Sequence, residues 1–283
     1  MIKYIYLMLN QTMPEWLPGF AYNFFYIIAC ITFAILILFH FIRYGISLKN
    51  TIFTVVILTV TYIILADIGV RIAGIFYLSP EFYNPFFMLK VFVAKPSKTY
   101  HAAILLIIIW SFIYCRLMFD KNWRMPFDSL ALYLPIVHAI GRLSCLSFGC
   151  CWGDELGICL PGTDIPFKNP IPLYESLFCI VIFAVLLFVF KKIHPRPAKG
   201  ASMDENEKLL SAAQVSFAGI ILPIYMVLYG LWRFVIEFFR TNPKLLFSLT
   251  QAQIVMILFV LIGGIIITIK FYRYKGSNLK FLG

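Results

Sequence analysis

Residues 221–240, with the sequence ILPIYMVLYGLWRFVIEFFR, decide the fold class of this chain. The stretch is as long as a helix that crosses a bilayer, which takes about 20 mainly apolar residues. Four of its polar residues stand at steps of four and therefore share one helical face: Tyr225, Tyr229, Arg233 and Glu237. The stretch predicts a membrane helix with one polar side, and ionisable residues inside a membrane are functional candidates by default.

The composition of the whole chain indicates a membrane protein. Of the 283 residues, 61% are hydrophobic and 13% are charged, whereas soluble domains carry about 25% charged residues. A soluble fold would need an implausibly large core to hide this much apolar surface. We therefore expect an all-α integral membrane protein that forms a single polytopic domain over residues 1–283.

Seven apolar stretches are long enough to predict transmembrane helices. They lie near residues 20–42, 50–70, 102–119, 128–148, 173–190, 212–232 and 252–271. The stretch at 83–92 is too short to cross, so we expect it at the membrane interface. Residues 1–19 predict an N-terminal interfacial segment without a cleavable signal peptide, and residues 191–208 predict a cytoplasmic loop.

The distribution of Lys and Arg predicts the orientation of the chain. With the N-terminus outside, fourteen of these residues fall on the cytoplasmic side and nine on the outer side. Cytoplasmic loops of membrane proteins carry the excess of positive charge, so we expect the N-terminus outside and the C-terminus in the cytoplasm. The same topology, together with anionic lipid, explains the net charge of +11, and no nucleic-acid partner is expected.

The fourth span carries an arginine with no acidic residue within helical reach. His138, Arg142 and Cys145 follow at steps of four and three and share one face. A guanidinium is always charged and its planar fork matches phosphate oxygens, so a lipid phosphate is one expected partner of Arg142. The alternative is an acidic residue of another helix: Glu175, Glu237 or Asp67. His138 alone is more often a structural residue than a catalytic one.

Other ionisable residues also have structural interpretations. Two pairs of opposite charge stand four residues apart and predict local ion pairs: Arg233 with Glu237, and Asp67 with Arg71. His101 precedes the third span and could accept a proton near pH 7. From its position alone, however, it is more often an interfacial histidine than a base.

The cysteines leave three interpretations open. The seven thiols show no paired CxxC frame, so no zinc module is signalled and we expect no metal or cofactor. Buried free cysteines usually behave as small hydrophobic residues. On an oxidising outer side, a disulfide among Cys145, Cys150, Cys151 and Cys159 is a second possibility. A redox or metal protein centred on the first three of these is a third, which the spacing does not support.

The chain resembles the bacterial prolipoprotein diacylglyceryl transferases in five segments that follow in the same order. The most specific is YGLWRFVIEFFRTNP (229–243), which is similar to YGxxRxxxEFFRxPD in that family. The other segments are NPIPLYES (169–176), GRLSCLSFGCCWG (141–153), RIAGIFY (71–77) and VFVAKPSKTYHAA (91–103). In that family, phosphatidylglycerol donates its diacylglyceryl group to the cysteine thiol of a lipoprotein precursor. The reaction takes place at the outer face of the bacterial inner membrane, and glycerol phosphate leaves.

The resemblance implies a role for each residue at a matching position. Arg142 and Arg233 are expected to bind the phosphate of the donor lipid. His101 is expected to deprotonate the acceptor thiol, while Tyr229 and Glu237 act beside Arg233 in the catalytic group. The remaining substrate-binding positions implied by the same matching are Gly141, Cys145, Gly153, Tyr174, Glu175 and Arg240.

The chain departs from the family pattern in the polar residues of one segment. Cys145 and Phe148 stand where the family has asparagines, and Cys150 stands where it has a glutamate. We therefore expect a divergent relative, and two alternatives remain open. One is a paralogue with a different acceptor or lipid, and the other is a non-catalytic lipid-binding or lipid-translocating protein, which would need the arginines but not His101.

Overall fold

The computed structural model describes residues 14–78, 101–159, 166–195, 212–240, 242, 244–246 and 248–280. In this part of the chain, seven helices are long and apolar enough to span a membrane, which confirms the predicted number. They are contained in α2 (Trp16–Arg43), α3 (Leu48–Leu78), α5 (His101–Phe119), α6 (Arg124–Phe148), α7 (Ile171–Ile193), α10 (Ile221–Ile236) and α11 (Gln251–Lys280). The shorter elements are η1 (Asp120–Asn122), α9 (Ala212–Phe217), η2 (Glu237–Phe239), β1 (Glu155–Cys159), β2 (Pro166–Lys168), β3 (Lys244–Leu246) and β4 (Leu249–Thr250).

The predicted flanking segments are only partly covered by the described residues. The segment 83–92 and residues 196–208 of the predicted loop lie outside them. Helix α7 ends at Ile193, so the first three residues of that predicted loop are helical instead. Helix α2 begins at Trp16, so the last four residues of the predicted N-terminal segment 1–19 belong to this helix.

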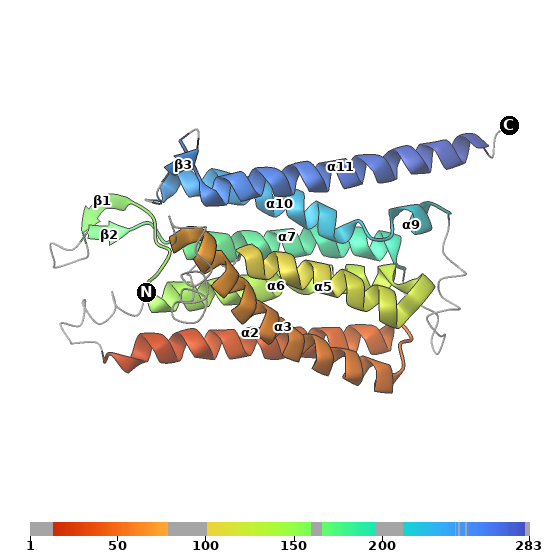
Figure 1. Cartoon of the computed structure of the whole chain (residues 1–283), viewed down its shortest axis with the longest axis horizontal. Coiled ribbons are helices and arrows are strands. Elements are labelled where there is room, and N and C mark those ends of the chain that lie inside the picture. The colour runs from red at the N-terminus through yellow and green to blue at the C-terminus, as the bar shows by residue number, and fades with distance from the viewer. Residues whose placement is uncertain are drawn as a thin grey trace.

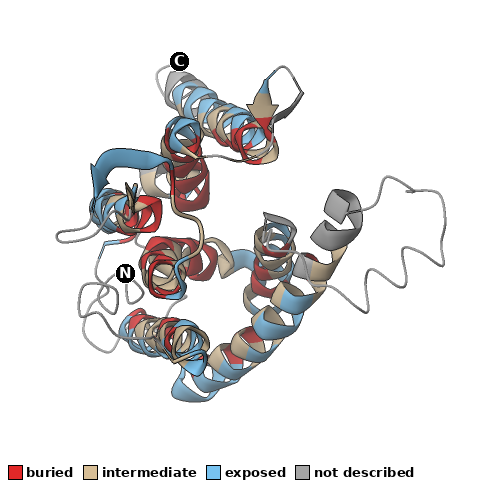
Figure 2. Ribbon diagram, turned by 90° about the vertical axis from the view of Figure 1, so that its left-hand side faces the viewer, coloured by how far each residue is buried: buried red, intermediate tan, exposed pale blue. Residues whose placement is uncertain are grey.

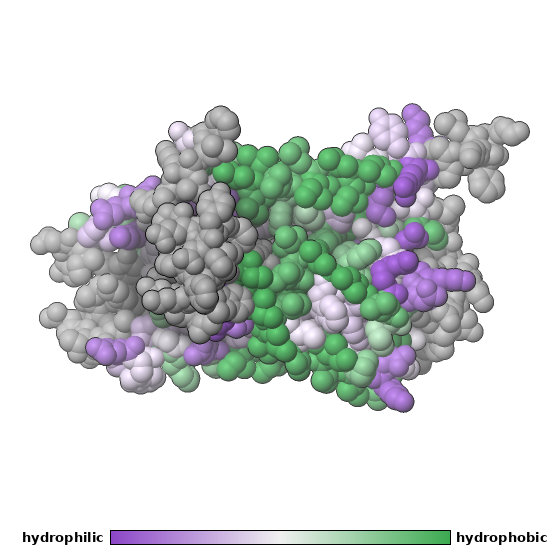
Figure 3. All heavy atoms as spheres, viewed as in Figure 1, coloured by the Kyte–Doolittle hydropathy of each residue, from purple (hydrophilic) through white to green (hydrophobic). Residues whose placement is uncertain are grey.

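The long helices run along the length of the molecule, and the smaller elements gather at its two ends (Figure 1). The hairpin of β1 and β2 and the strand β3 lie at one end, which we call the hairpin end. Helix α9 and the C-terminal part of α11 lie at the other. Between the ends, apolar residues form a belt around the visible face, with hydrophilic residues on both sides (Figure 3). This pattern is what a chain crossing a bilayer requires.

Helices α6 and α10 form the interior of the bundle. Helix α6 packs against α2, α7 and α10, and α10 also packs against α7 and α11. Viewed from the hairpin end, buried residues lie on the helix faces that turn toward the middle of this group (Figure 2). Of the seven spans, α6 and α10 have the largest buried share. This position explains why these two stretches carry polar residues, because their polar faces contact protein instead of lipid.

The sixth span begins later than predicted. The sequence predicted one helix over residues 212–232, but α9 ends at Phe217 and α10 begins only at Ile221. In the intervening turn, Gly219 has a φ of +86°, a conformation that favours glycine. The prediction of one continuous helix was therefore wrong at its N-terminal end.

A buried carboxylate from another helix fixes the start of α10. Asp128 of α6 accepts hydrogen bonds from the backbone N–H of Gly219 at 2.6 Å and of Ile221 at 3.2 Å. The ring of His194 lies 2.8 Å from the same carboxylate. The first N–H groups of a helix have no partner within the helix, and negative charge is favourable at this end. Asp128 thus accepts hydrogen bonds from the N–H groups at the start of α10 and links this helix to α6.

Glycines allow α10 and α11 to approach closely. A Cβ atom added at Gly263 of α11 would lie 2.7 Å from the carbonyl oxygen of Pro223 and 2.9 Å from a methyl group of Val227. Its neighbour Gly264 has no atom within 4 Å of the same added Cβ. Small residues at such contacts are a common basis of helix association in membranes.

These neighbouring glycines provide a matched test of the packing of α10. Gly263→Ala should lower the free energy of unfolding by about 1–3 kcal/mol, because the methyl group has no space. Gly264→Ala should be neutral or stabilising, since alanine favours a helix over glycine by about 1 kcal/mol. Thermal unfolding of the purified variants in detergent measures both effects. Equal changes in the two variants would contradict the close contact.

Candidate active site

Glu175 lies at the centre of a group of buried charges. Its side chain, on α7, is fully buried. One carboxylate oxygen lies 3.1 Å from Nε of Arg142 on α6, and the other lies 3.1 Å from Nε of Arg233 on α10. Both arginine side chains are also buried, at 4% exposure. Three separate helices therefore meet at one carboxylate.

One of the two predicted partners of Arg142 is present in this arrangement. The structure confirms the alternative in which an acidic residue of another helix faces it, and that residue is Glu175. Arg142 therefore has a fixed counter-ion within the protein. Glu175 carries one negative charge, however, and both Arg142 and Arg233 contact it. This carboxylate therefore cannot neutralise both guanidinium groups.

A second carboxylate extends the group along α10. Glu237 pairs with Arg233 as predicted and lies 3.8 Å from an Nη atom of Arg240. Asn242 and Thr250 donate hydrogen bonds to the other oxygen of Glu237, at 2.5 and 3.1 Å. These contacts hold the carboxylate in one orientation. The predicted local pair of Arg71 and Asp67 is also confirmed, at 2.7 Å, but it is partly exposed and separate from this group.

His138 and two tyrosines extend the group beyond its charged residues. Nε of Arg142 donates to Nε2 of His138 at 3.2 Å, and an Nη group of Arg142 donates to the hydroxyl of Tyr229 at 3.3 Å. The neutral ring of His138 then carries its proton on Nδ1, which lies 3.0 Å from the hydroxyl of Tyr225. Sequence reasoning treated His138 as structural, although its spacing of four from Arg142 was a signal for this contact.

The five charged residues of this group leave one positive charge. Arg142, Arg233 and Arg240 carry three guanidinium groups, and Glu175 and Glu237 carry two carboxylates. Nε of Arg240 is buried and has no hydrogen-bond partner among the described residues. An excess of charge is costly away from water. A group with fixed guanidinium donors and surplus positive charge can bind an anion, and a phosphate fits guanidinium geometry best. We call these five residues the arginine cluster.

The remaining predicted site residues are two glycines, a tyrosine and a histidine, and they have different surroundings. Gly141 precedes Arg142, and a Cβ added there would meet no atom within 4 Å. Gly153 packs where its loop meets the end of α10, because an added Cβ would lie 2.3 Å from the carbonyl oxygen of Phe239. The side chain of Tyr174 is 38% exposed, so it does not join the buried group. His101 is the first residue of α5, and its side chain lies outside the described part of the chain.

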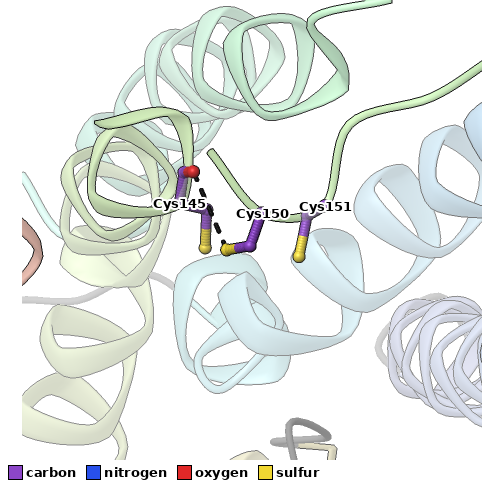
Figure 4. A group of neighbouring side chains, drawn as sticks. All are labelled: Cys145, Cys150 and Cys151. Atoms are coloured by element: carbon purple, nitrogen blue, oxygen red, sulfur yellow. Dashed lines mark hydrogen bonds between the residues drawn. The ribbon is translucent and has the colours of Figure 1, made fainter. Parts of the chain in front are cut away.

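Three cysteines gather at the C-terminal end of α6 (Figure 4). The sulfur atoms of Cys145, Cys150 and Cys151 all lie within 4.8 Å of one another. We call this group the thiol triad. The structure describes all seven cysteines of the chain and each is free, so the predicted alternative of a disulfide is not realised.

The thiols of the triad differ in their tendency to ionise. The pKa of Cys151 is lowered, because its sulfur accepts hydrogen bonds from Cys145 and Cys150 and lies near Arg240 and Arg142. The pKa of Cys150 is raised, because it donates to the other two thiols and is partly buried. The triad therefore favours a negative charge that is centred on Cys151.

Comparison of the sequence with known proteins shows the family to which the chain belongs. A family model described as prolipoprotein diacylglyceryl transferase matches residues 18–269. The chain belongs to that family. The match includes five of the seven spans entirely, most of the first and the last span, and all residues of the arginine cluster and the thiol triad.

Two similar proteins come from different bacteria. A phosphatidylglycerol–prolipoprotein diacylglyceryl transferase of Rickettsia typhi is 28% identical over 222 residues, which cover 74% of this chain and 76% of the relative. A protein of the same name from Campylobacter hominis is 27% identical over 219 residues, which cover 74% of this chain and 69% of the relative. The resemblance seen in five sequence segments is thereby confirmed.

The shared position of Glu175 predicts an unusually large effect of removing its charge. Glu175→Gln should lower the free energy of unfolding by about 3–5 kcal/mol, because two buried guanidinium groups would then face each other without a carboxylate. Asp67→Asn removes one partner of a partly exposed pair and should cost less than about 1 kcal/mol. Thermal unfolding of both variants in detergent makes the comparison, and similar losses would contradict the role of Glu175.

Proposed function

We propose that this chain transfers the diacylglyceryl group of an anionic, phosphatidylglycerol-like lipid to the cysteine thiol of a lipoprotein precursor. The observation that carries the proposal is the meeting of Arg142 and Arg233, from separate helices, at one buried carboxylate. Membership of the family supports the reaction type. The names of the two relatives, which mention phosphatidylglycerol and prolipoprotein, support the donor and the acceptor.

The arginine cluster suits the charge changes of this reaction. A bond forms between the acceptor sulfur and a glycerol carbon of the donor, while the bond from that carbon to a phosphate oxygen breaks. Glycerol phosphate leaves with the electron pair of the broken bond. Fixed positive charge near the leaving oxygens stabilises this transition state. Arg142 and Arg233 would bind the phosphate, and Arg240 offers a buried donor without another partner among the described residues.

The acidic and phenolic residues would act by holding the arginines in place. Glu175 and Glu237 both contact the single guanidinium group of Arg233, one at Nε and the other at an Nη atom. Tyr229 accepts a hydrogen bond from Arg142. A preorganised set of donors does not have to reorient as the reaction proceeds, which is the main source of electrostatic catalysis. Gly141, next to Arg142 and with open space at its Cα, would leave room for the lipid.

The acceptor thiol must lose its proton, because the thiolate is the nucleophile. His101 is the proposed base, since it stands at the position of the family histidine in the sequence. The start of α5 is held close to α3, as a Cβ added at Gly69 would lie 2.3 Å from Cα of Ala103. The backbone at His101 is therefore anchored to a neighbouring span.

We also propose the topology and location that the sequence predicted. The N-terminus would lie outside and the C-terminus in the cytoplasm of the bacterial inner membrane, as the bias of Lys and Arg indicates. The hairpin end and the arginine cluster would then face the outer side, where a secreted precursor arrives. The chain would act as a single polytopic domain with residues 191–208 on the cytoplasmic side, and the membrane would supply the donor lipid.

Replacing Arg233 tests the role of the arginine cluster. Arg233→Ala should reduce the transfer rate by about 10²–10³-fold or more, because a fixed positive charge at the leaving group is lost. The measurement is transfer of a labelled diacylglyceryl group from phosphatidylglycerol vesicles to a cysteine peptide with a lipoprotein signal. Arg116→Ala at the end of α5 is the control for loss of an arginine elsewhere. Retained transfer by purified Arg233→Ala would refute the mechanism.

A second variant separates the enzyme from a lipid-binding protein on the same scaffold. His101→Ala should abolish transfer but leave binding of phosphatidylglycerol vesicles unchanged, because only the proton acceptor is removed. If wild-type protein binds these vesicles but transfers nothing, and His101→Ala behaves identically, the non-catalytic alternative is correct. Rescue of cells depleted of their own transferase distinguishes the general enzyme from a paralogue with another acceptor.

A further inference from the structure

The thiol triad is built by a sharp turn that follows α6. Cys145 lies in the last turn of the helix, and Gly149 ends it with a φ of +81°. Cys151 then has a φ of +63°, which is uncommon for a residue other than glycine. Such backbone conformations often occur at functional sites. The turn brings the sulfur atoms of Cys150 and Cys151 back beside that of Cys145, so residues five and six positions apart form one group (Figure 4).

The loop is held against the arginine cluster by backbone contacts. The N–H of Asp154 donates to the carbonyl oxygen of Phe239 at 3.1 Å, and the N–H of Gly153 donates to that of Asn169 at 2.8 Å. These bonds connect the loop to η2, which follows α10, and to the residues just before α7. Arg142 stands one helical turn before Cys145 and Arg240 directly follows Phe239, and both guanidinium groups interact electrostatically with Cys151. Negative charge on the sulfur atoms would therefore be offset by two guanidinium groups.

We propose that Cys145, Cys150 and Cys151 bind one zinc(II) ion and leave a fourth coordination position for the thiolate of the acceptor. Zinc–sulfur bonds of about 2.3 Å in a tetrahedral site place the sulfur atoms about 3.8 Å apart. The present separations, all within 4.8 Å, exceed that value by about 1 Å at most. Three thiolates form a soft ligand set that selects zinc or copper(I) over magnesium or calcium.

An open fourth position suits the chemistry of thiol transfer, and this part of the inference rests on the proposed function. Zinc sites that act on substrates keep three protein ligands and one exchangeable position. A thiol that coordinates the ion is deprotonated outright, so the acceptor S–H would lose its proton to the proposed base His101 on binding. The sulfur lone pair would then attack the glycerol carbon as the carbon–oxygen bond breaks. Zinc is neither oxidised nor reduced, and glycerol phosphate leaves with the bonding electrons.

The proposal gives a reason for the main departure of this chain from the family pattern. Cys145 and Cys150 replace an asparagine and a glutamate of the resembling segments, and both belong to the triad. The sequence predicted no metal because the spacing Cys-x₄-Cys-Cys matches no zinc module. The turn at Gly149, with its positive φ, supplies the proximity that the spacing does not indicate.

The metal content of the purified full-length protein tests the first part of the proposal. Reduced protein in detergent, supplemented with zinc and then freed of excess, should hold about one zinc per chain by elemental analysis. Cys145→Ser, Cys150→Ser and Cys151→Ser should each lose most of it. Cys159→Ser is the matched control, because this exposed cysteine of β1 lies outside the triad and its loss should change nothing. Thermal unfolding identifies variants that fail to fold.

Cobalt(II) substitution tests the open position. The wild-type protein should show the charge-transfer absorption of thiolate bound to cobalt, and a peptide with the acceptor cysteine should change this spectrum, whereas the same peptide with serine should not. No zinc above the level of the serine variants, or a disulfide within the triad that persists after mild reduction, would overturn the metal site. A spectrum that the cysteine peptide leaves unchanged would overturn the open position. Neither measurement requires diacylglyceryl transfer. The zinc site can therefore be refuted while Arg233→Ala still shows the expected loss of activity, so the two proposals are tested separately.

Discussion

The carboxylate of Glu175, shared by two guanidinium groups in the interior of a membrane bundle, is the interaction on which the structure of the site depends. Without it, Arg142 and Arg233 would place two like charges in a region that water does not reach, at a cost of several kcal/mol. With it, α6, α7 and α10 are joined at one point. The two carboxylates of the arginine cluster neutralise only two of its three positive charges. The contacts that hold the helices together therefore also leave a positive site for an anion.

Helix α10 is fixed by polar contacts at both of its ends. Asp128 satisfies the backbone N–H groups at its start, and Glu175 and Glu237 hold Arg233 near its end. Between these points, close contact with α11 depends on small residues such as Gly263. A helix restrained in this way cannot easily turn or slide. Its arginine is therefore held in one position relative to α6, as a preorganised phosphate site requires.

The sequence predicted the features that depend on local pattern. Seven spans follow from apolar length, and the pairing of Arg233 with Glu237 follows from spacing along a helix. The break before α10 was missed because it is stabilised by Asp128, which is more than ninety residues away in the chain. The role of His138 was underestimated for a similar reason, since one of its partners, Tyr225, belongs to another helix. The thiol triad could not be predicted from the sequence, because it depends on a turn that the spacing of the cysteines does not define.

The central claim is that Arg142 and Arg233 form one phosphate site around Glu175. A structure of the protein determined in a bilayer that contains phosphatidylglycerol tests it most directly. We expect a lipid phosphate whose oxygens lie at hydrogen-bond distance, about 2.7–3.2 Å, from nitrogen atoms of both guanidinium groups. A phospholipid headgroup bound elsewhere, with the two arginines still closed on Glu175 and no phosphate between them, would contradict it.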